Sequence, residues 1–330
     1  MNLIYNKIFL EHETGIHPES ARRFEYLKNL KETEVDNGEK YLELVHPKKY
    51  IDFVRESCKK SLDLDPDTKT CPKTFEVACK AVGAAIHASK NNDFALVRPP
   101  GHHATADRAM GFCIFNNAAI ASQRLVNKGK KVFILDFDCH YGNGTSEIFY
   151  NSDNVLYMSM HQYPYYPGNG FINEIGAGDG KGFTINIPIL PKTGDDIYLE
   201  ILNFFIPIIK EQFKPDVVCC SAGFDGHHSD PICDLSYSLN AFHQTGKLLK
   251  ENFKDIFAVL EGGYDPKWLA RCIMDFQDGI NGKETSFSDD PMTKTLAYNR
   301  QKFNDNFEQL KMNLKPYWKL NALINLNPHF

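Results

Sequence analysis

The sequence has no hydrophobic run long enough to cross a membrane and no excess of positive charge. Its apolar stretches fall well short of the ~18 residues that a transmembrane helix needs. Its 37 basic residues are outnumbered by 42 acidic ones, and the formal net charge of −5 argues against a nucleic-acid-binding surface. The amino terminus lacks the charged, apolar and small-residue segments of a signal peptide. These absences predict a cytoplasmic protein with no direct nucleic-acid partner and no membrane partner.

The sequence also lacks the regularly spaced cysteine pairs of a small secreted domain. Its nine cysteines are scattered over 330 residues, and an odd number in a large chain without a secretion signal predicts free thiols in a reducing compartment. Adjacent Cys219 and Cys220 lie in an apolar run, which favours structural burial over redox chemistry. No repeat, low-complexity segment or linker divides the chain. We therefore expect a single domain over residues 1–330, in which 283–330 form a C-terminal helix and an extended tail.

The most informative stretch is 132–145, VFILDFDCHYGNGT. Four apolar residues run without alternation into two aspartates and a histidine, and a loop with two glycines follows. Such a run is typical of a buried parallel strand whose carboxyl end opens into a site. Asp138 and His140 are two residues apart, so on an extended backbone their side chains point to the same side.

Strand-like and helix-like segments alternate along the rest of the chain. Strands are expected over 3–5, 95–97, 155–160, 184–189, 216–222 and 256–260, and helices from about Ser20 and over 74–86, 116–126, 195–213 and 239–253. Pro207 predicts a kink or break in its helix. The long loop 162–182 is of a kind that is usually functional. This alternation predicts an α/β fold: an open, mostly parallel sheet in three layers, with helices on both faces.

Polar residues gather where the expected strands end. They are His102 and His103, then Asp136, Asp138 and His140, then Ser159 to His161, then Asp225, and finally Tyr264. A catalytic zinc ion needs three protein ligands and one open position. Asp138 and His140 supply two, and Asp225 is the candidate for the third. Taken alone, an Asp-x-His pair is more often a hydrogen-bonded structural pair, and adjacent histidines can simply pack in a turn.

Five motifs together carry a family resemblance. RPPGHHA (98–104), GFCIFNN (111–117), DFDCHYGNGT (136–145), SAGFD (221–225) with Asp230-Pro231, and EGGYD (261–265) resemble the zinc-dependent histone deacetylase and acetylpolyamine amidohydrolase superfamily. The resemblance covers about residues 3–282 in the family's order. The form RPPGHHA is more similar to class II and to bacterial or archaeal members than to class I. The resemblance implies an arginase/deacetylase-like fold.

The resemblance also implies roles for individual residues. Asp138, His140 and Asp225 would bind one zinc ion per chain, which polarises the amide carbonyl and activates a water molecule. His103 would act as general base and then as acid, because the ordinary pKa of a histidine, ~6.5, lies near working pH. His102 would be its electrostatic partner, held by Asp136, and Asn143 would orient His103. Tyr264 would donate its hydroxyl to the oxyanion.

The same resemblance places residues around the substrate and an inner cation. Gly111, Phe112 and Tyr166 would line a narrow tunnel for an aliphatic side chain, with Ile232 and Gly262 beside the substrate. Arg23 matches an arginine of an inner acetate-release channel. A monovalent cation, usually potassium in relatives, would be held by Asp136, Ser159 and the backbone carbonyls of Asp138, His140 and Met160.

Two positions depart from the family pattern. Tyr141 replaces a histidine that usually follows the zinc-binding histidine, and Tyr166 replaces a frequent tunnel phenylalanine. Neither change removes a catalytic residue. Ile232 is apolar where some polyamine-specific relatives carry a glutamate that recognises a second amine.

The leading hypothesis is a zinc-dependent amidohydrolase that deacetylates N-acetylated amines, foremost N-ε-acetyl-lysine in proteins or peptides. The nearest rival is an acetylpolyamine amidohydrolase that acts on small acetylated amines. More distant rivals are a two-manganese ureohydrolase on the same fold and a non-catalytic binder of acetylated ligands. Homo-oligomerisation is left open.

Overall fold

Seven parallel strands form one sheet at the centre of the molecule. The computed structural model describes residues 1–320 of the chain. Its strand order is β1-β2-β7-β6-β3-β4-β5, and every neighbouring pair is parallel. The strands are β1 (Leu3–Ile4), β2 (Phe94–Ala95), β3 (Val132–Asp136), β4 (Val155–Gln162), β5 (Thr184–Ile189), β6 (Val217–Ala222) and β7 (Ile256–Leu260). The expected parallel α/β sheet is confirmed.

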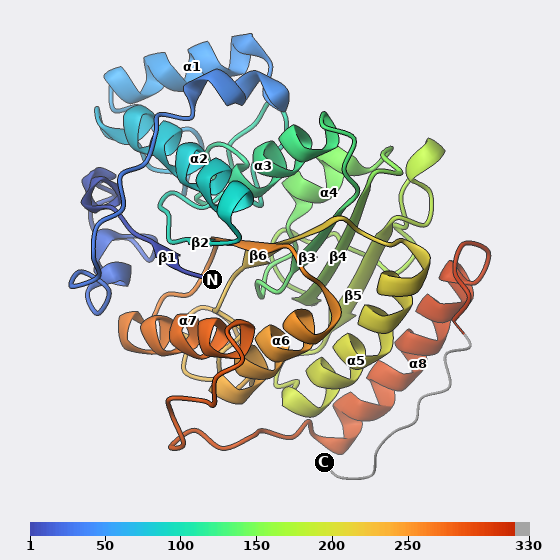
Figure 1. The fold of residues 1–330 in the computed structure, drawn as a ribbon. Coiled ribbons are helices and arrows are strands. Elements are labelled where there is room, and N and C mark those ends of the chain that lie inside the picture. Colours follow the sequence, from blue (N-terminus) through green and yellow to red (C-terminus); the bar gives the residue numbers. More distant parts are fainter. Residues whose placement is uncertain (321–330) are drawn as a thin grey trace.

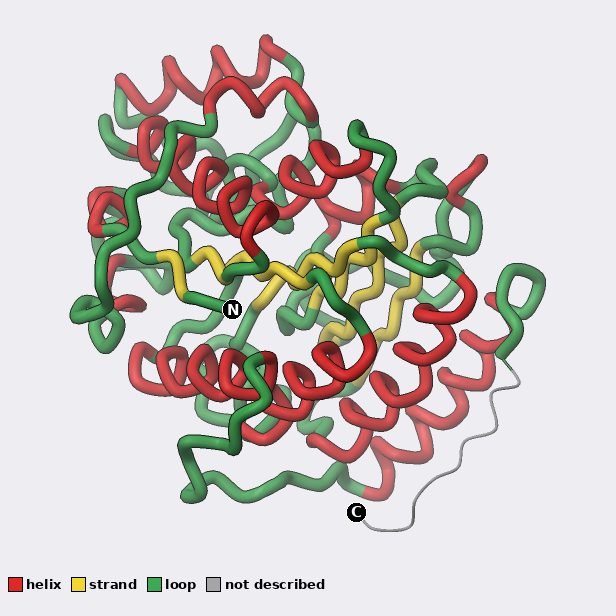
Figure 2. The backbone as a smooth tube through the Cα atoms, in the orientation of Figure 1, coloured by secondary structure: helices red, strands yellow, loops and turns green. Residues whose placement is uncertain are grey.

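Helices cover both faces of the sheet (Figures 1 and 2). One group comprises α1 (Lys48–Lys59), α2 (Thr74–Asn91), α3 (Asn117–Val126) and α4 (Asn143–Phe149). The other comprises α5 (Asp195–Gln212), α6 (Leu239–Asn252), α7 (Pro266–Ile280) and α8 (Ala297–Leu314). Because neither face meets solvent, every residue of β3, β4, β6 and β7 is buried, which explains why their sequences do not alternate. Cys219 and Cys220 are buried in β6, as expected.

The register of the sheet brings the polar strand ends to one edge. Asp136, the last residue of β3, lies opposite Ser159 of β4 on one side and Ser221 of β6 on the other. Ala222, the last residue of β6, lies opposite Leu260 of β7. The segments that follow β3, β6 and β7 therefore leave the same edge side by side, although they are far apart in the sequence.

Several local expectations were wrong. The loop expected around Gly142 and Gly144 contains α4, which begins at Asn143. The helix expected from Ser20 is a single 3-10 turn, Ala21–Phe24, and Phe24 and Leu27 are buried. Strand β2 ends at Ala95, and Leu96 continues it only through a hydrogen bond from its N–H to the carbonyl of Ile4.

The helix α5 runs through Pro207 without the expected break. Proline removes the hydrogen bond to the carbonyl four residues earlier, which is that of Asn203. Asn203 and Pro207 both lie on the exposed side of α5, so water can satisfy that carbonyl. The C-terminal helix α8 spans Ala297–Leu314 and lies within the segment 283–330, where a helix was expected. The expected extended tail falls partly on residues 321–330, which lie outside the described residues.

Candidate active site

Two carboxylates and one imidazole converge where β3 and β6 end. Nδ1 of His140 lies 2.9 Å from Oδ2 of Asp225 and 3.1 Å from Oδ1 of Asp138. Both carboxylates are buried and His140 is nearly so. The predicted third ligand, Asp225, therefore meets the other two, because β6 is the direct neighbour of β3 in the sheet.

Backbone groups from neighbouring strand ends hold these carboxylates in place. The N–H of Gly262 donates to Oδ2 of Asp138 at 2.8 Å, and the N–H of Cys139 donates to Oδ1 of Asp225 at 2.7 Å. A Cβ atom added at Gly262 would lie 2.4 Å from Oδ2 of Asp225, and one at Gly223 would lie 2.0 Å from Oδ2 of Asp138. Only glycine allows this close approach.

The electrostatics of this cluster favour a bound cation. Burial alone would lower the pKa of His140, but hydrogen bonds to Asp138 and Asp225 raise it to about 10. Burial would likewise raise the pKa of Asp138, but His102 and His140 keep it well below its usual value. Burial and the charge of Asp138 raise the pKa of Asp225, so a positive charge placed between the two carboxylates would stabilise their ionised forms. Two buried carboxylates with one imidazole nitrogen between them fit the oxygen and nitrogen ligand set of a catalytic zinc ion.

The histidine pair lies beside this cluster. The rings of His102 and His103 are 4.1 Å apart, and the His103 ring is 5.9 Å from that of His140. Nδ1 of His102 lies 3.1 Å from Oδ2 of Asp136, which also accepts the hydroxyl of Tyr157 at 2.8 Å. Nδ1 of His103 donates to Oδ1 of Asn143 at 2.8 Å, an arrangement that leaves Nε2 of His103 free to accept a proton.

The two histidines have opposite charge preferences. Burial would lower the pKa of His102, but the carboxylates of Asp138 and Asp136 raise it to about 10. Burial and the adjacent charges of His102 and His140 lower the pKa of His103 well below its usual value. At neutral pH one ring is therefore protonated and the other neutral, which suits an electrostatic partner and a general base respectively.

Glu261 anchors the turn that carries these histidines, and it was not singled out from the sequence. Its Oε2 accepts the backbone N–H groups of Gly101 and His102 at 2.7 and 3.1 Å, and its Oε1 accepts the hydroxyl of Ser221 at 2.8 Å. Burial raises the pKa of Glu261 to about 7. Its position directly after β7 was the available signal, because the other polar groups of the site also follow strands.

Arg23 and Asp230 position the segment that bears Tyr264. Nε of Arg23 donates to the carbonyl of Gly263 at 2.7 Å, and its guanidinium lies 5.1 Å from the centre of the Tyr264 ring. The N–H of Tyr264 donates to Oδ2 of Asp230 at 2.7 Å. Burial and the charge of Asp225 raise the pKa of Tyr264 well above its usual value, so its hydroxyl stays protonated and can donate a hydrogen bond.

The residues expected around the substrate surround His103 and Tyr264. The ring of Tyr166 packs edge-on against His103 at 5.1 Å, and Phe112 packs edge-on against Tyr264 at 5.9 Å. Gly111 has a φ of +56°, and an added Cβ would lie 2.5 Å from the His103 ring. On the loop after β6, Ile232 is half-buried and its carbonyl accepts the hydroxyl of Tyr165.

The departure at Tyr141 lies away from the ligand cluster. Its hydroxyl donates to Oγ of Ser146 at 2.6 Å, and its ring packs 4.8 Å from that of His161. Ser159, expected at the inner cation, contacts His161 as well, with 2.9 Å between its Oγ and Nδ1. Met160 is buried in β4 beside Ser159.

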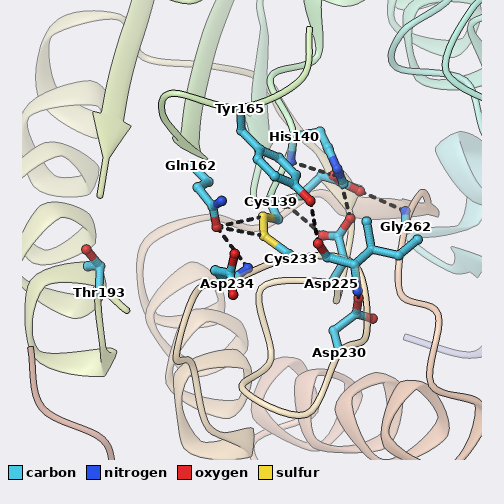
Figure 3. Close-up of a disulfide and its surroundings, with 12 residues drawn as sticks. Cys139, His140, Gln162, Tyr165, Thr193, Asp225, Asp230, Cys233, Asp234 and Gly262 are labelled. Atoms are coloured by element: carbon cyan, nitrogen blue, oxygen red, sulfur yellow. Dashed lines mark hydrogen bonds and ion pairs between the residues drawn. A yellow bond between two sulfur atoms is a disulfide. The ribbon is translucent and has the colours of Figure 1, made fainter. Parts of the chain in front are cut away.

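The expectation that all cysteines are free was wrong. Cys139 and Cys233 form a disulfide, and the other seven cysteines, all within the described residues, are free (Figure 3). The sequence could not reveal this pair, because the two residues are 94 positions apart and only the convergence of β3 and the loop after β6 brings them together.

Comparison with known proteins agrees with this geometry. Residues 17–280 match the model of the histone deacetylase domain. A probable deacetylase of Archaeoglobus fulgidus is 37% identical over 79% of this chain and 80% of its own length. Histone deacetylase 14, chloroplastic, of Arabidopsis thaliana is 32% identical over 88% of this chain and 82% of its own. The crystal structure of the HDA15 HD domain superposes with a TM-score of 0.85 at 26% identity, covering 96% of this chain and 95% of that one.

The family match shows a hydrolase built on a parallel α/β sheet. The chain belongs to the histone deacetylase family and has the arginase/deacetylase fold. It is a deacetylase of that family, and its substrates are therefore acetylated compounds.

Proposed function

We propose that this protein is a zinc-dependent deacetylase that hydrolyses the N-ε-acetyl-lysine amide of proteins or peptides. One observation carries the proposal: a single ring nitrogen, Nδ1 of His140, lies within 3.1 Å of carboxylate oxygens from both Asp138 and Asp225. A zinc ion held by these three residues would polarise the acetyl carbonyl and lower the pKa of the attacking water.

The surrounding residues supply the remaining steps. Neutral His103, oriented by Asn143, takes a proton from water at Nε2 and later returns it to the leaving amine. Protonated His102 stabilises negative charge in the site. The hydroxyl of Tyr264 donates to the oxyanion that develops at the carbonyl, and Arg23 keeps this tyrosine in position through the carbonyl of Gly263.

The aliphatic stem of lysine suits the walls that Phe112, Tyr166 and Gly111 provide. At the position of Ile232 the side chain is apolar, and the backbone carbonyl already accepts the hydroxyl of Tyr165. This position offers no charge that could bind the second amine of a polyamine. These features favour acetyl-lysine over acetylpolyamines.

The test is acetate release by the zinc-loaded protein from an acetyl-lysine peptide, acetylputrescine and acetylspermidine. We expect turnover of the peptide, retained metal but no turnover in His103→Ala, and unchanged turnover in His87→Ala, a matched histidine on α2. Turnover of polyamines alone would replace the lysine assignment with a polyamine one. Binding of the peptide without any acetate release would indicate a non-catalytic binder, and two metal ions per chain with urea formation would indicate a ureohydrolase.

Four further expectations accompany this proposal. A potassium ion would lie at Asp136 and Ser159 and at the carbonyls of Asp138, His140 and Met160, and acetate would leave past Arg23. One catalytic domain would span residues 1–330, which is supported by the packing of Phe303 and Leu314 of α8 in the same core as the sheet. A cytoplasmic location stays a prediction. No helix within residues 1–320 is long and apolar enough to span a bilayer.

A further inference from the structure

The disulfide between Cys139 and Cys233 links two parts of the active site. Cys139 lies between the candidate ligands Asp138 and His140, and Cys233 lies on the loop after β6. The Cα atoms are 6.5 Å apart. Sγ of Cys139 and ligand atoms of His140 and Asp225 all lie within 4.8 Å of one another. The disulfide therefore lies directly beside the ligand cluster.

Each half of the disulfide belongs to a segment with a defined task (Figure 3). On one side, the N–H of Cys139 donates to the carboxylate of Asp225 at 2.7 Å. On the other, Asp230 accepts the N–H of Tyr264 at 2.7 Å, and the carbonyl of Ile232 accepts the hydroxyl of Tyr165. The bond between the sulfurs thus couples the ligand turn to the loop that holds the oxyanion-binding tyrosine.

The surroundings of the two sulfurs suit the reduced form as well as the oxidised form. Oε1 of Gln162 lies 3.3 Å from Sγ of Cys233 and 3.9 Å from Sγ of Cys139, and it accepts the N–H of Asp234 at 2.9 Å. In the disulfide this oxygen keeps the bond from Asp234. After reduction it offers an acceptor to an S–H donor, so a buried thiol has a partner.

We propose that Cys139 and Cys233 form a reversible thiol–disulfide site that controls how firmly the ligand cluster holds its metal. The disulfide itself goes beyond the proposed function, whereas its control of metal binding rests on the zinc site of that function. Seven other cysteines remain free, so the chain does not depend on a disulfide framework for its fold.

The chemistry is exchange with a low-molecular-weight dithiol. A thiolate of the reductant attacks the sulfur of Cys233, because this residue is 6% exposed and Cys139 is fully buried. The sulfur of Cys139 leaves with the bonding electron pair and takes up a proton. The second thiol of the reductant then attacks the mixed disulfide, releasing Cys233 as a thiol and the reductant as its cyclic disulfide. A low-molecular-weight disulfide reverses the process and is itself reduced to two thiols.

Reduction should loosen the ligand turn. In the oxidised form, the turn 138–140 and the loop 226–234 are joined covalently, and the Asp225 carboxylate lies between them. In the reduced form they are linked only indirectly, through the hydrogen bonds of Cys139 to Asp225 and of Gln162 to the carbonyl of Cys139 and the N–H of Asp234. Groups that orient metal ligands typically change metal affinity by ~10–100-fold, and we expect the reduced protein to lose zinc to a chelator at least about tenfold faster than the oxidised protein.

The first measurement is the thiol content of the full chain, unfolded under non-reducing conditions after treatment with oxidised glutathione. We expect seven alkylated cysteines, rising to nine after dithiothreitol, and a disulfide-linked peptide pair containing Cys139 and Cys233. Nine alkylated cysteines in both states, or a different pair, would overturn the proposal. This result does not depend on any enzymatic activity, so it stands apart from failure of the proposed function.

The second measurement is the rate of zinc transfer to a chromogenic chelator, together with the thermal midpoint. The oxidised wild type should release zinc slowly. It should also melt about 7 °C above the reduced form, because the disulfide closes the loop between Cys139 and Cys233 and so lowers the entropy of the unfolded chain. Cys233→Ser should match the reduced protein under both conditions, whereas Cys71→Ser, at a free cysteine, should keep the full redox response. Equal zinc release by the two forms of the wild type, or slower release after reduction, would refute the control of metal binding.

Discussion

Replacing Gly262 with alanine should disable the candidate metal site without unfolding the protein. The added Cβ would lie 2.4 Å from Oδ2 of Asp225 and 2.6 Å from Oδ2 of Asp138, and real Cβ atoms essentially never approach other atoms within 3.0 Å. At least one carboxylate oxygen must therefore move by about 0.6 Å, whereas zinc–ligand distances are held within roughly 0.2 Å. Gly262 has no positive φ, so alanine fits its backbone and the effect is purely steric.

We expect zinc affinity to fall by about 10–100-fold, or ~1.4–2.7 kcal/mol, with at least an equal loss of kcat/KM at limiting zinc. Zinc titration by calorimetry measures the first quantity and acetate release the second. Gly129→Ala is the control: nothing lies within 4 Å of its added Cβ, but its φ of +77° strains an alanine. That variant should lose ~1 kcal/mol of stability and none of its zinc affinity. Unchanged zinc affinity in Gly262→Ala would refute the proposed ligand cluster.

Three other predictions concern single side chains. Tyr264→Phe should lower kcat by ~100–1000-fold at unchanged zinc content, because it removes the oxyanion donor; an unaltered kcat would exclude that role. Asn143→Ala should lower kcat by about tenfold or more. Asn143→Asp should restore kcat, because its carboxylate again offers Nδ1 of His103 an acceptor. Equal kcat values in the wild type and both variants would show that Asn143 does not orient the base. Burial lowers the pKa of His46 from 6.5 to about 4. Between pH 6.5 and 4, His46 therefore binds a proton in the unfolded chain but not in the folded one. As the pH falls through this range, His46 should lower the free energy of unfolding by up to about 3 kcal/mol. Denaturant unfolding should show this excess loss in the wild type relative to His46→Gln, and identical pH profiles would contradict it.

The sheet could be predicted because burial on both faces leaves a direct trace in the sequence. Val132–Leu135 and Ile256–Leu260 are apolar at every position. A strand with one solvent-exposed face would instead alternate apolar and polar residues. Because parallel strands end at the same edge of a sheet, the polar residues that follow them were expected to lie close together. Asp138, His140 and Asp225 could be predicted as one cluster in this way. Strand order was the missing information: only the β3–β6 pairing shows that Asp225 reaches the other two.

The errors arose where tertiary contacts override local preference. Gly144 favours a loop, yet α4 includes it, because an added Cβ there would lie 2.2 Å from the carbonyl of Ala104 and only glycine lets the helix pack so closely. Pro207 is tolerated because it faces solvent. Glu261 and the Cys139–Cys233 pair act through partners far away in the sequence, and no spacing rule connects them.

The most direct test of the account is a zinc titration of metal-depleted protein, followed by acetate release from an acetyl-lysine peptide. Turnover should rise linearly and level off at one equivalent of zinc per chain, and Asp225→Asn should show no such break at the same protein concentration. Turnover that persists in the metal-depleted protein, a break at two equivalents, or an undiminished response in Asp225→Asn would contradict a single zinc ion held by Asp138, His140 and Asp225.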